Sequence, residues 1–587
     1  MRHGDESPIT LVEIADHADT ACAEARGRSG NLFGPPDPNS VFQGYGRSPE
    51  DREKTRDLLS KLAVAMSKEG VRRDPATNDN HDIPAGYTYF GQLVAHDLTF
   101  HKTPTPRQPV TASDLENLRD KPMLLQCLYG SGPDEAPWLY RSPEDGHLPR
   151  SQLRLGATQP SRFDAEKHGR FEDIPRLSCA LYDEKPTVPK CHDPLIADER
   201  NDDNLIISQL VVLFHKLHNK IFDLVKRSDL PPPPPDRHQR WLHERHRYEL
   251  ARRLAVLSYR SVVKSDFLDK LLDRRVYCDY RNKSSLDEFV TPPFKADAGA
   301  GCLVYDLPIE FSIAAFRVGH AMIQPDYEFN QFHSSDSPHT RERANLQDLL
   351  EFSGARNIDQ VPITDDWVID WARFFDINDS TPNPSRQLRP VFTRVLSRAG
   401  FGADDGREGG LIYKDLVRHL THGVRNVATL IGEDGYDLGT RFDDEIYRNS
   451  GVRSEAIRQR LKEGTDRTSS DRPFSPDELR ILSEDPPLLY FLLFEAERCH
   501  DGKRLGPLGS TIIAEIIFGA MVGTEDEIGT LPSGLEGNVF PDGRPKMMGD
   551  VVRFVEGPSP TTEQPVSTDP VSSGQATTAR PHSIGAE

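Results

Sequence analysis

The stretch that decides the fold of this chain is residues 89–100, which read YFGQLVAHDLTF. As a helix, the stretch places Gln92 and His96 on one face, because residues four apart lie above one another. Most of the other side chains are apolar, so the imidazole lies in an apolar wall. A histidine in such a place is either a proton acceptor for catalysis or a core residue with a satisfied hydrogen bond, and the stretch alone favours the core residue.

The composition favours a soluble enzyme that acts on small molecules. The length of 587 residues allows three or four domains or one large helical enzyme. The 72 Lys and Arg against 92 Asp and Glu give a net charge of −20, which argues against a role in coating nucleic acid or anionic membrane. The seven cysteines form no CxxC pair, so neither a disulfide framework nor a zinc module is indicated, and a reducing compartment is the simpler expectation.

Targeting signals are missing from the residues where they would be expected. The first twenty residues contain no apolar core of a secretory signal. The longest apolar segments, 205–214 and 512–522, are interrupted by polar residues and are too short to span a bilayer. The sequence therefore predicts a cytoplasmic protein without a membrane span.

The spacing of apolar residues predicts a mainly α chain with long loops and little β structure. Residues 1–50 are rich in Gly, Pro, Asp and Ser and are expected to form an extended arm, residues 51–555 a globular body, and residues 556–587 a disordered tail. The five prolines at 231–235 indicate a stiff connector rather than a ligand for a proline-binding domain. The predicted helices cover residues 57–66, 202–225, 236–263, 310–323, 391–399, 412–424, 476–481, 488–498 and 511–522.

Two further polar islands stand in apolar surroundings. Residues 198–203 read DERNDD and precede the 202–225 helix, for which Asn201 or Asp202 is the expected cap. Arg200 opposes the dipole of that helix, so we expect an anionic partner or a side chain that turns away, although a solvated charged loop is the simpler interpretation. In the 310–323 segment His320 points into apolar material beside Gly319, where a flat ligand could approach. Metal ligation competes there with a histidine bonded to a backbone carbonyl.

Taken together, the motifs resemble those of animal-type heme peroxidases, in the peroxidase and cyclooxygenase superfamily, including its bacterial members. The motifs occur in the family's order and approximate spacing: Gly91-Gln92-x3-His96-Asp97, Ala197-Asp198-Glu199-Arg200-x2-Asp203, Leu213-x4-His218-Asn219 and Phe316-Arg317-x-Gly319-His320-x2-Ile323-Gln324-Pro325. The likeness extends over most of residues 30–555, so the resemblance implies one large heme peroxidase domain over residues 51–555.

The resemblance also implies a reaction and the residues for it. The chain is expected to use hydrogen peroxide to oxidise small organic reductants or easily oxidised halides with heme b, and to serve in the response to oxidative stress. His320 is similar to the proximal iron ligand and His96 to the distal base. Arg200 is similar to the charge-stabilising arginine, Gln92 to the residue that positions peroxide, and Arg317 to the arginine near the heme propionates.

The sequence departs from the family pattern at several cofactor positions. Asp415 stands where the family usually has an asparagine that accepts the Nδ1–H of the proximal histidine, and a carboxylate there is expected to lower the iron potential. Ala95 replaces one acid that forms a heme ester, and Asp203 is shorter than the usual Glu at the other, so at most partial covalent attachment through Asp203 is expected. Leu124 replaces an expected acid of the family's calcium site, so calcium is doubtful.

Two alternatives stay open beside the peroxidase. A fatty-acid dioxygenase-like enzyme would carry a Tyr three residues before the proximal histidine, whereas this chain has Arg317 there. A non-catalytic heme-binding sensor would explain the altered calcium and ester positions, but it gives no reason to keep Gln92, His96 and Arg200 together. The oligomeric state is open.

Overall fold

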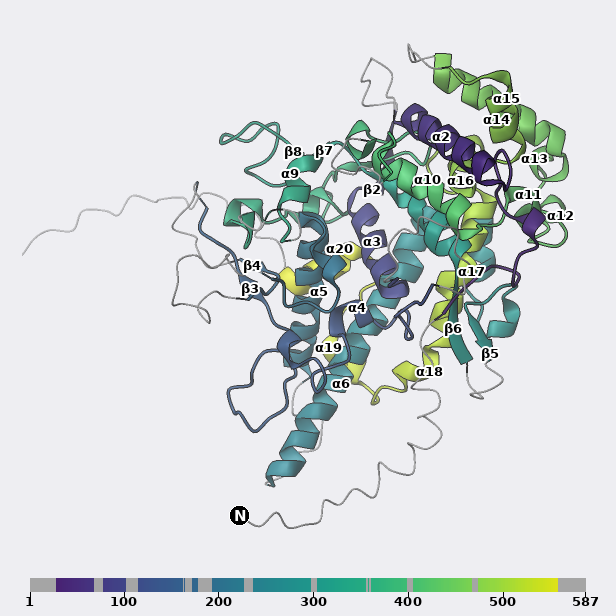
Figure 1. The fold of residues 1–587 in the computed structure, drawn as a ribbon. Coiled ribbons are helices and arrows are strands. Elements are labelled where there is room, and N and C mark those ends of the chain that lie inside the picture. Colours follow the sequence, from purple (N-terminus) through teal and green to yellow (C-terminus); the bar gives the residue numbers. More distant parts are fainter. Residues whose placement is uncertain are drawn as a thin grey trace, which may run out of the picture.

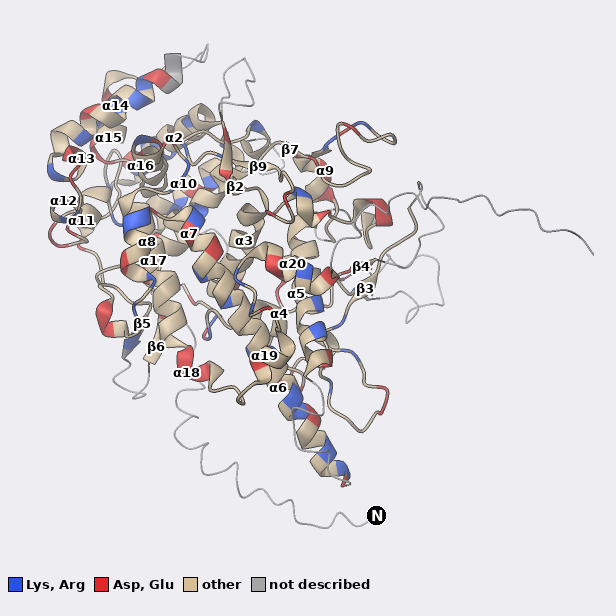
Figure 2. Ribbon diagram, turned by 180° about the vertical axis from the view of Figure 1, so that it is seen from behind, with Lys and Arg blue, Asp and Glu red and all other residues tan. Residues whose placement is uncertain are grey.

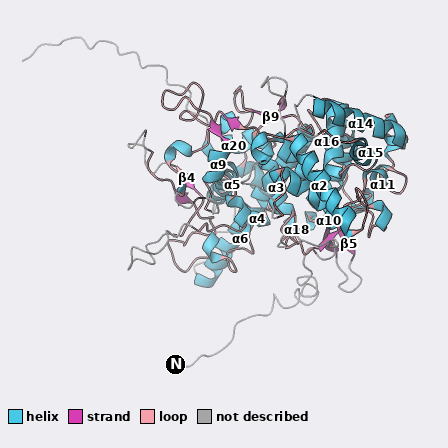
Figure 3. Ribbon diagram, turned by 45° about the horizontal axis from the view of Figure 1, so that its top comes forward, coloured by secondary structure: helices cyan, strands magenta, loops and turns pink. Residues whose placement is uncertain are grey.

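A computed structural model of the chain describes residues 28–67, 78–101, 115–161, 163, 171–177, 193–225, 236–296, 303–354, 357, 360–397, 405–466 and 473–557. The prediction of a mainly α fold with little β structure is confirmed, since helices form most of the ordered framework and the sheets are small (Figures 1 and 3). Most of the predicted arm, the proline run at 231–235 and nearly all of the predicted tail lie outside the described residues.

The α-helices are distributed along the whole described chain. They are α2 (Pro49–Met66), α3 (Gly86–Leu98), α4 (Gln126–Tyr129), α5 (Leu205–Leu224), α6 (Arg237–Val262), α7 (Leu268–Leu271), α8 (Arg274–Tyr280), α9 (Leu346–Glu351), α10 (Gly410–His422), α11 (Val427–Ile431), α12 (Leu438–Arg441), α13 (Glu445–Arg448), α14 (Ser450–Asp466), α15 (Pro476–Glu484), α16 (Leu488–His500), α17 (Pro507–Gly523), α18 (Glu525–Ile528), α19 (Leu535–Val539) and α20 (Met548–Glu556). Two π-helices are η8 (Val263–Phe267) and η10 (Glu310–Ala314). The 3-10 helices include η7 (Glu199–Asp202), η11 (Ala315–Met322) and η15 (Arg394–Ser397).

The strands are short and pair in four small sheets. In the three-stranded sheet β6 (Leu303–Pro308) lies between β1 (Arg28–Gly30), which is parallel to it, and β5 (Phe294–Ala296), which is antiparallel. The antiparallel pairs are β2 (Asp79–Pro84) with β9 (Pro384–Arg386), β3 (Gly156–Ala157) with β4 (Glu172–Asp173), and β7 (Asp326–Tyr327) with β8 (Ala344–Asn345). The sheets therefore fasten loops to the helical body and do not form its core.

The helices α3 and α5 lie at the centre of the body, with α14 and α15 at its edge (Figures 1 and 3). The apolar residues that predicted α5 are buried, and α5 packs against both α3 and α6. The cap of α5 is Asn204, whose Oδ1 accepts the N–H of Ile207 at 3.0 Å. The predicted caps Asn201 and Asp202 belong instead to η7, because Asp198 starts this separate turn with a side chain that accepts the N–H of Arg200.

The helix predicted over residues 310–323 is not an α-helix. It consists of the π-helix η10 followed by the 3-10 helix η11, which carries His320. Such short, irregular helical turns change the direction of side chains and are frequent at functional sites. The helix predicted over residues 391–399 is only the short η15 among the residues described there. The helix predicted from residue 57 begins earlier, at Pro49, because Ser48 caps it and acidic residues occupy its first turn.

The described part of the N-terminal segment is fastened to the body by two buried charged residues. Glu310 accepts the side-chain N–H of Asn31 and the backbone N–H of Leu32, both at 2.9 Å. Arg425 donates from Nε to the carbonyl oxygen of Leu32 at 2.6 Å and from Nη2 to that of Gly34 at 2.7 Å. These contacts hold the segment against η10, the element that precedes His320.

Basic residues predominate along the exposed part of α6, with a few acidic residues between them (Figure 2). Arg245 lies 2.8 Å from Asp134, and Arg247 and Arg252 each lie 3.3 Å from a glutamate of the same helix. In the part of the chain that the structure describes, no helix is both long enough and apolar enough to span a membrane.

The start of α3 requires a glycine. Gly86 donates its N–H to the carbonyl oxygen of Phe374 at 3.0 Å, and a Cβ at this position would lie 2.5 Å from that oxygen and from the ring of Phe375. The helix that carries His96 therefore begins in direct contact with the backbone of a distant segment.

Replacement of Gly86 by alanine should lower the free energy of unfolding by about 1–3 kcal/mol, because the added methyl group has no room. Urea unfolding followed by circular dichroism measures the change. Gly146→Ala is the matched control, since a Cβ at Gly146 meets no atom within 4 Å. Equal stabilities of the two variants would contradict the close contact at Gly86.

Candidate functional site

Two facing segments keep exposed surface in an otherwise buried region. In α3 only Gly91, Gln92 and Ala95 are partly exposed, and all other residues of the helix are buried. In η11 the partly exposed residues are Phe316, Arg317, Gly319 and His320. The two segments pack against each other, and a Cβ added at Gly319 would meet no atom within 4 Å. The pattern indicates that α3 and η11 border one open space.

His320 is oriented from behind by the carboxylate of Asp415 on α10. The distance from His320 Nδ1 to Asp415 Oδ2 is 2.6 Å, and Asp415 is fully buried. Burial disfavours the charged carboxylate, but His320, Arg317 and Arg418 outweigh it, so the pKa of Asp415 lies below its ordinary value. The carboxylate therefore accepts the Nδ1–H of His320, which leaves the lone pair of Nε2 for another partner.

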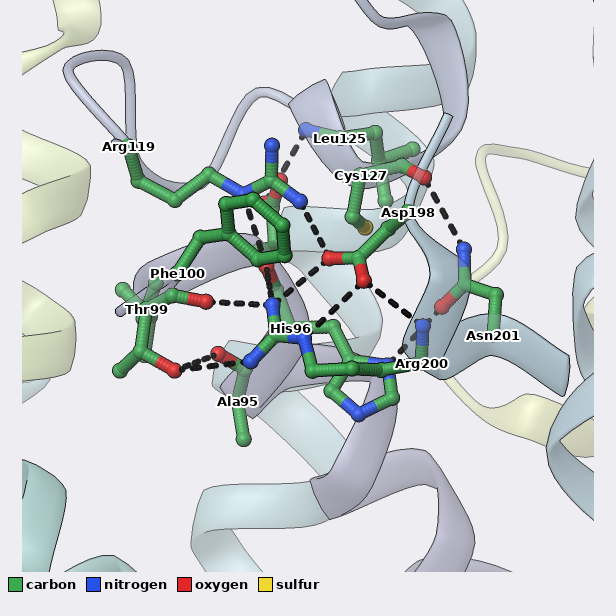
Figure 4. Close-up of polar contacts among 12 residues, drawn as sticks. Ala95, His96, Thr99, Phe100, Arg119, Leu125, Cys127, Asp198, Arg200 and Asn201 are labelled. Carbon is green, nitrogen blue, oxygen red and sulfur yellow. Dashed lines mark hydrogen bonds and ion pairs between the residues drawn. The ribbon is translucent and has the colours of Figure 1, made fainter. Parts of the chain in front are cut away.

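His96 is oriented in a similar way by Asn201 (Figure 4). The distance from His96 Nδ1 to Asn201 Oδ1 is 2.9 Å, and Asn201 Nδ2 donates to the carbonyl oxygen of Cys127 at 3.0 Å. Because the amide nitrogen is already used as a donor, its oxygen faces the imidazole and accepts the Nδ1–H. Burial and the charge of Arg200 lower the pKa of His96 to about 3, so the ring is neutral with an unprotonated Nε2 at neutral pH.

Arg200 has the anionic partner that its position predicted. Its Nε and Nη2 lie 3.0 and 2.6 Å from the two carboxylate oxygens of Asp198, and Nη1 lies 3.3 Å from Thr99 Oγ1. The guanidinium carbon also lies 4.9 Å from the centre of the Phe100 ring (Figure 4). About a quarter of the Arg200 side chain stays exposed, at 26%. The interpretation of residues 198–203 as a solvated charged loop is wrong, since Asp198, Asn201 and Asp202 are buried.

Arg119 and Asn201 contact His96, although neither was predicted as a site residue. Arg119 donates from Nε to the carbonyl oxygen of His96 at 2.9 Å and pairs with Asp198, which also binds Arg200. Arg119 lies in an irregular segment far from η7 in the sequence, so no local pattern signals this contact. Asn201 follows Arg200 directly, and only its burial distinguishes it from a surface asparagine.

The other predicted site residues lie around the same elements. Gln92 accepts the side-chain N–H of Asn204 at 3.2 Å, and Asp203 is half-buried at the end of η7. Arg317 donates from Nε to the carbonyl oxygen of Ser312 at 3.1 Å. Burial, Arg418 and Arg200 lower the pKa of Arg317 to about 10, while Asp415 opposes them. Arg418 and Arg200 therefore both act on Arg317 with positive charge.

Asp97 is buried beside this site. Its Oδ2 accepts the N–H of Leu125 at 3.0 Å, and burial raises the pKa of its carboxyl group although Arg119 opposes the shift. Within the described ranges, no group of three or more His, Cys, Asp and Glu side chains is arranged to hold a metal ion.

The residues present fit a haem group. The Nδ1–H of His320 is already bound by Asp415, so the lone pair of its Nε2 is available to iron, as in haem-ligating histidines. Among the described residues, the charges that act on the pKa of Arg317 are those of two arginines, Arg418 and Arg200, and of one carboxylate, Asp415. The surplus positive charge suits an anionic group with carboxylate arms such as the haem propionates. Gly319 is partly exposed and has no side chain, so it also leaves room for a flat ring beside His320.

The family model described as animal haem peroxidase matches residues 125–363, which confirms the resemblance that the motifs suggested. The match includes Arg200, Asp203, Arg317 and His320. A comparison with curated proteins finds no match.

Several solved structures align with this chain at low sequence identity. Peroxidase A from Dictyostelium discoideum aligns with a TM-score of 0.50 and 14% identity, over 90% of this chain and 96% of that one. Fatty acid alpha-dioxygenases align with a TM-score of 0.49 and 12% identity. The alignment with the Arabidopsis thaliana enzyme covers 90% of this chain and 78% of that enzyme's chain. The alignment with the Oryza sativa enzyme covers 94% of this chain and 90% of that enzyme's chain. The similarity to peroxidase A shows the fold alone.

The neutral state of His96 has a measurable consequence for stability, which five other histidines with lowered pKa values share. Burial lowers the pKa of His101, His215, His218, His419 and His422 to about 4. In the unfolded chain each of these groups has a pKa of roughly 6.5, so at pH 5 the unfolded state binds protons that the folded state does not. Stability is therefore complete above about pH 6.5 and falls as the pH decreases toward 4.

The free energy of unfolding in urea should be lower at pH 5 than at pH 7.5 by roughly several kcal/mol. His215→Gln should reduce this loss by about 1–2 kcal/mol, because the amide can still donate to the carbonyl oxygen of Arg154 but does not titrate. His238→Gln, at an exposed position, is the control that should leave the loss unchanged. An identical loss in His215→Gln and the parent protein would show that His215 titrates normally in the folded state.

Proposed function

We propose that the chain is a haem peroxidase, because residues 125–363 match the family model described as animal haem peroxidase. It would reduce hydrogen peroxide while oxidising small organic reductants or easily oxidised halides. The observation that carries the proposal is the pair of imidazoles on α3 and η11. Each has its Nδ1–H bound by a buried acceptor and, among the described residues, no hydrogen-bond partner at Nε2, which suits one ring for binding iron and the other for accepting a proton.

The proposal assigns the cofactor to residues of η11 and α10. His320 would bind the iron through Nε2, and Arg317 and Arg418 would bind the carboxylates of the cofactor. Haem b, when bound, supplies an iron centre at which the O–O bond of peroxide can be cleaved. A partial covalent attachment of the haem would form an ester with Asp203. The second ester position of the family holds Ala95, which has no functional group to form one. The doubtful calcium site stays a prediction.

His96 would act as the base and then the acid. Its neutral imidazole can take a proton from peroxide at Nε2 and return it to the departing oxygen, because the Nδ1–H stays bound to Asn201 throughout. Arg200 would stabilise the negative charge that develops on the oxygen, and Gln92 would orient water or peroxide. A pKa of about 3 for His96 keeps the base unprotonated over the whole neutral range.

Asp415 would make this enzyme a moderate oxidant. A charged carboxylate that accepts the Nδ1–H of His320 increases electron donation from the imidazole, which stabilises ferric iron. Oxidation of chloride is therefore disfavoured, whereas phenols, aromatic amines and easily oxidised halides stay accessible.

The alternatives from the sequence have less support. A fatty-acid dioxygenase-like reaction needs an oxidisable side chain beside the cofactor, and Arg317 stands at the position where that resemblance requires a tyrosine. A non-catalytic haem sensor does not need a neutral base, and Asn201 and Arg119 both contact His96.

The peroxidase proposal predicts that the haem-loaded protein has a Soret band and oxidises guaiacol when peroxide is added. His96→Ala should keep the Soret band and lower the peroxide-dependent rate by roughly 10²–10⁴-fold, because the base is lost. His320→Ala should lose or shift the Soret band. His238→Ala, at the exposed end of α6, is the control that should retain both properties. Haem binding without turnover would favour the sensor, and no haem binding would defeat all three functions.

Asp415→Asn should raise the midpoint potential of the bound haem by on the order of 50 mV, because a neutral amide donates less charge through His320 than a carboxylate does. Spectroelectrochemical titration of the Soret band measures the potential. Asp485→Asn is the control, since this carboxylate accepts the N–H of Gln43 and does not contact a histidine. An unchanged or lowered potential in Asp415→Asn would contradict the role assigned to Asp415.

A further inference from the structure

His96 is held at two points by residues to which no role has been assigned. Asn201 Oδ1 contacts Nδ1 of the His96 ring, and Arg119 Nε donates to the backbone carbonyl oxygen of His96 (Figure 4). We propose that Asn201 and Arg119 are positioning residues for the peroxide reaction. Asn201 fixes the tautomer of His96, and Arg119 fixes the residue's place and keeps the surrounding charge positive. This inference rests on the proposed function.

The amide of Asn201 has no freedom to turn. Its Nδ2 donates to the carbonyl oxygen of Cys127 at 3.0 Å, and its Oδ1 lies 2.9 Å from His96 Nδ1. Asn201 is fully buried, so water does not compete for either group. A rotated amide would place two N–H donors near a ring nitrogen and lose the bond to Cys127, which leaves buried polar groups without partners. The ring therefore carries its proton on Nδ1.

The tautomer decides whether His96 can act as a base. A neutral imidazole has one donor and one acceptor nitrogen, and only the nitrogen without a proton can take one from peroxide. With Nδ1–H bound to Asn201, Nε2 is that nitrogen. Without the acceptor, the ring could place its proton on Nε2 or turn about χ2, and a part of the molecules would have no base at the right place.

Arg119 connects His96 with Arg200 through Asp198. Arg119 is buried, with 6% of its surface exposed, and its Nη2 pairs with the carboxylate that also binds Nε and Nη2 of Arg200. One carboxylate shared by two guanidinium groups leaves a net positive charge beside the imidazole. Without Arg119, Asp198 would neutralise Arg200, and both the stabilisation of a developing anion and the low pKa of His96 would weaken.

Titratable groups lie on several elements around His96. Asp97 follows it on α3, Cys127 lies on α4, Arg119 lies in the preceding loop, Asp198 and Arg200 lie at η7, and η11, which packs against α3, carries Arg317 and His320. The other elements packed against α3 are α5, β2 and β9, which carry titratable residues such as His215, Asp79 and Arg386. After burial, Arg200 lowers the pKa of His96 most, Asp198 raises it, and Arg119 lowers it. Removal of Arg119 therefore shifts the pKa of His96 upward, and a new carboxylate at position 201 does so as well.

Cyanide binding to the ferric, haem-loaded protein tests the proposal without turnover. Hydrogen cyanide must give its proton to a base when it binds, and the shift of the Soret band follows the rate. The parent protein should show an association rate that does not change between pH 5 and 8, since His96 stays neutral. Asn201→Leu should lower the rate roughly tenfold at every pH, because the tautomer is no longer fixed.

Asn201→Asp separates positioning from a merely structural role. The carboxylate still accepts the Nδ1–H but stabilises the imidazolium, so the rate should fall on the acid side with an inflection between pH 5 and 8 and recover at higher pH. Arg119→Met should move the acid-side fall of the rate to a higher pH than in the parent protein, and Arg119→Lys should restore the parent profile because the charge is kept. A flat profile in Asn201→Asp, or an acid-side fall at the parental pH in Arg119→Met, would overturn the corresponding role.

Asn80→Asp is the matched control. Asn80 is buried in β2, donates to the carbonyl oxygen of Lys503 at 3.1 Å and accepts the N–H of Asp82 at 3.2 Å, but it does not contact His96. Its cyanide profile should equal that of the parent protein. An inflection in this variant would mean that any buried carboxylate changes the profile, which would overturn the specific role of Asn201.

A second measurement decides the tautomer independently of haem. In protein labelled with ¹⁵N in the histidine rings, the signals of His96 are assigned by their loss in His96→Gln. The proposal expects a protonated Nδ1 and an unprotonated Nε2, and a mixture of both tautomers in Asn201→Leu. An unchanged tautomer in Asn201→Leu would refute the positioning role even if peroxidase activity is found. If the tautomers are as expected but the haem-loaded parent protein has no peroxidase activity, the positioning of His96 by Asn201 is supported and only the proposed function is refuted.

Discussion

The hydrogen bond on the Nδ1 side of each imidazole is the constraint on which the site depends. His320 is bound to Asp415 and His96 to Asn201, and both acceptors are fully buried. An imidazole that is fixed in this way exposes its second nitrogen in a known protonation state. The charged acceptor and the neutral acceptor then give the two rings different chemistry, since a carboxylate increases electron donation and an amide leaves the ring a weak base.

The fold provides these acceptors from segments that are far apart in the sequence. Asp415 comes from α10, which packs against η10, and Asn201 comes from the short turn η7 before α5. Glu310 and Arg425 fasten the N-terminal segment to the same region through Leu32. The ion pairs of Asp198 with Arg119 and Arg200 likewise join the loop of Arg119 to η7 beside His96. The site is thus built by long-range contacts between short, irregular elements.

The regular parts of the fold follow from local patterns in the sequence, whereas the site follows from them only in part. Apolar residues at three- and four-residue steps predicted α5, because most residues of that helix are buried. The same pattern failed at residues 310–323, where the chain forms a π-helix and a 3-10 helix, since periodicity does not distinguish these from an α-helix. Family motifs and their spacing led to Asp415, and the hydrogen bond to His320 is present. Arg119 has neither a motif nor a local pattern, because its contacts with His96 and Asp198 exist only in the folded chain.

We propose that His96 and His320 present their Nε2 atoms to opposite faces of one haem. A crystal structure of the haem-loaded protein tests this arrangement. We expect an iron bound by His320 Nε2, with His96 Nε2 on the other face, unbound to iron, and with both Nδ1 hydrogen bonds intact. An iron bound by another residue, or by both histidines at once, would contradict it.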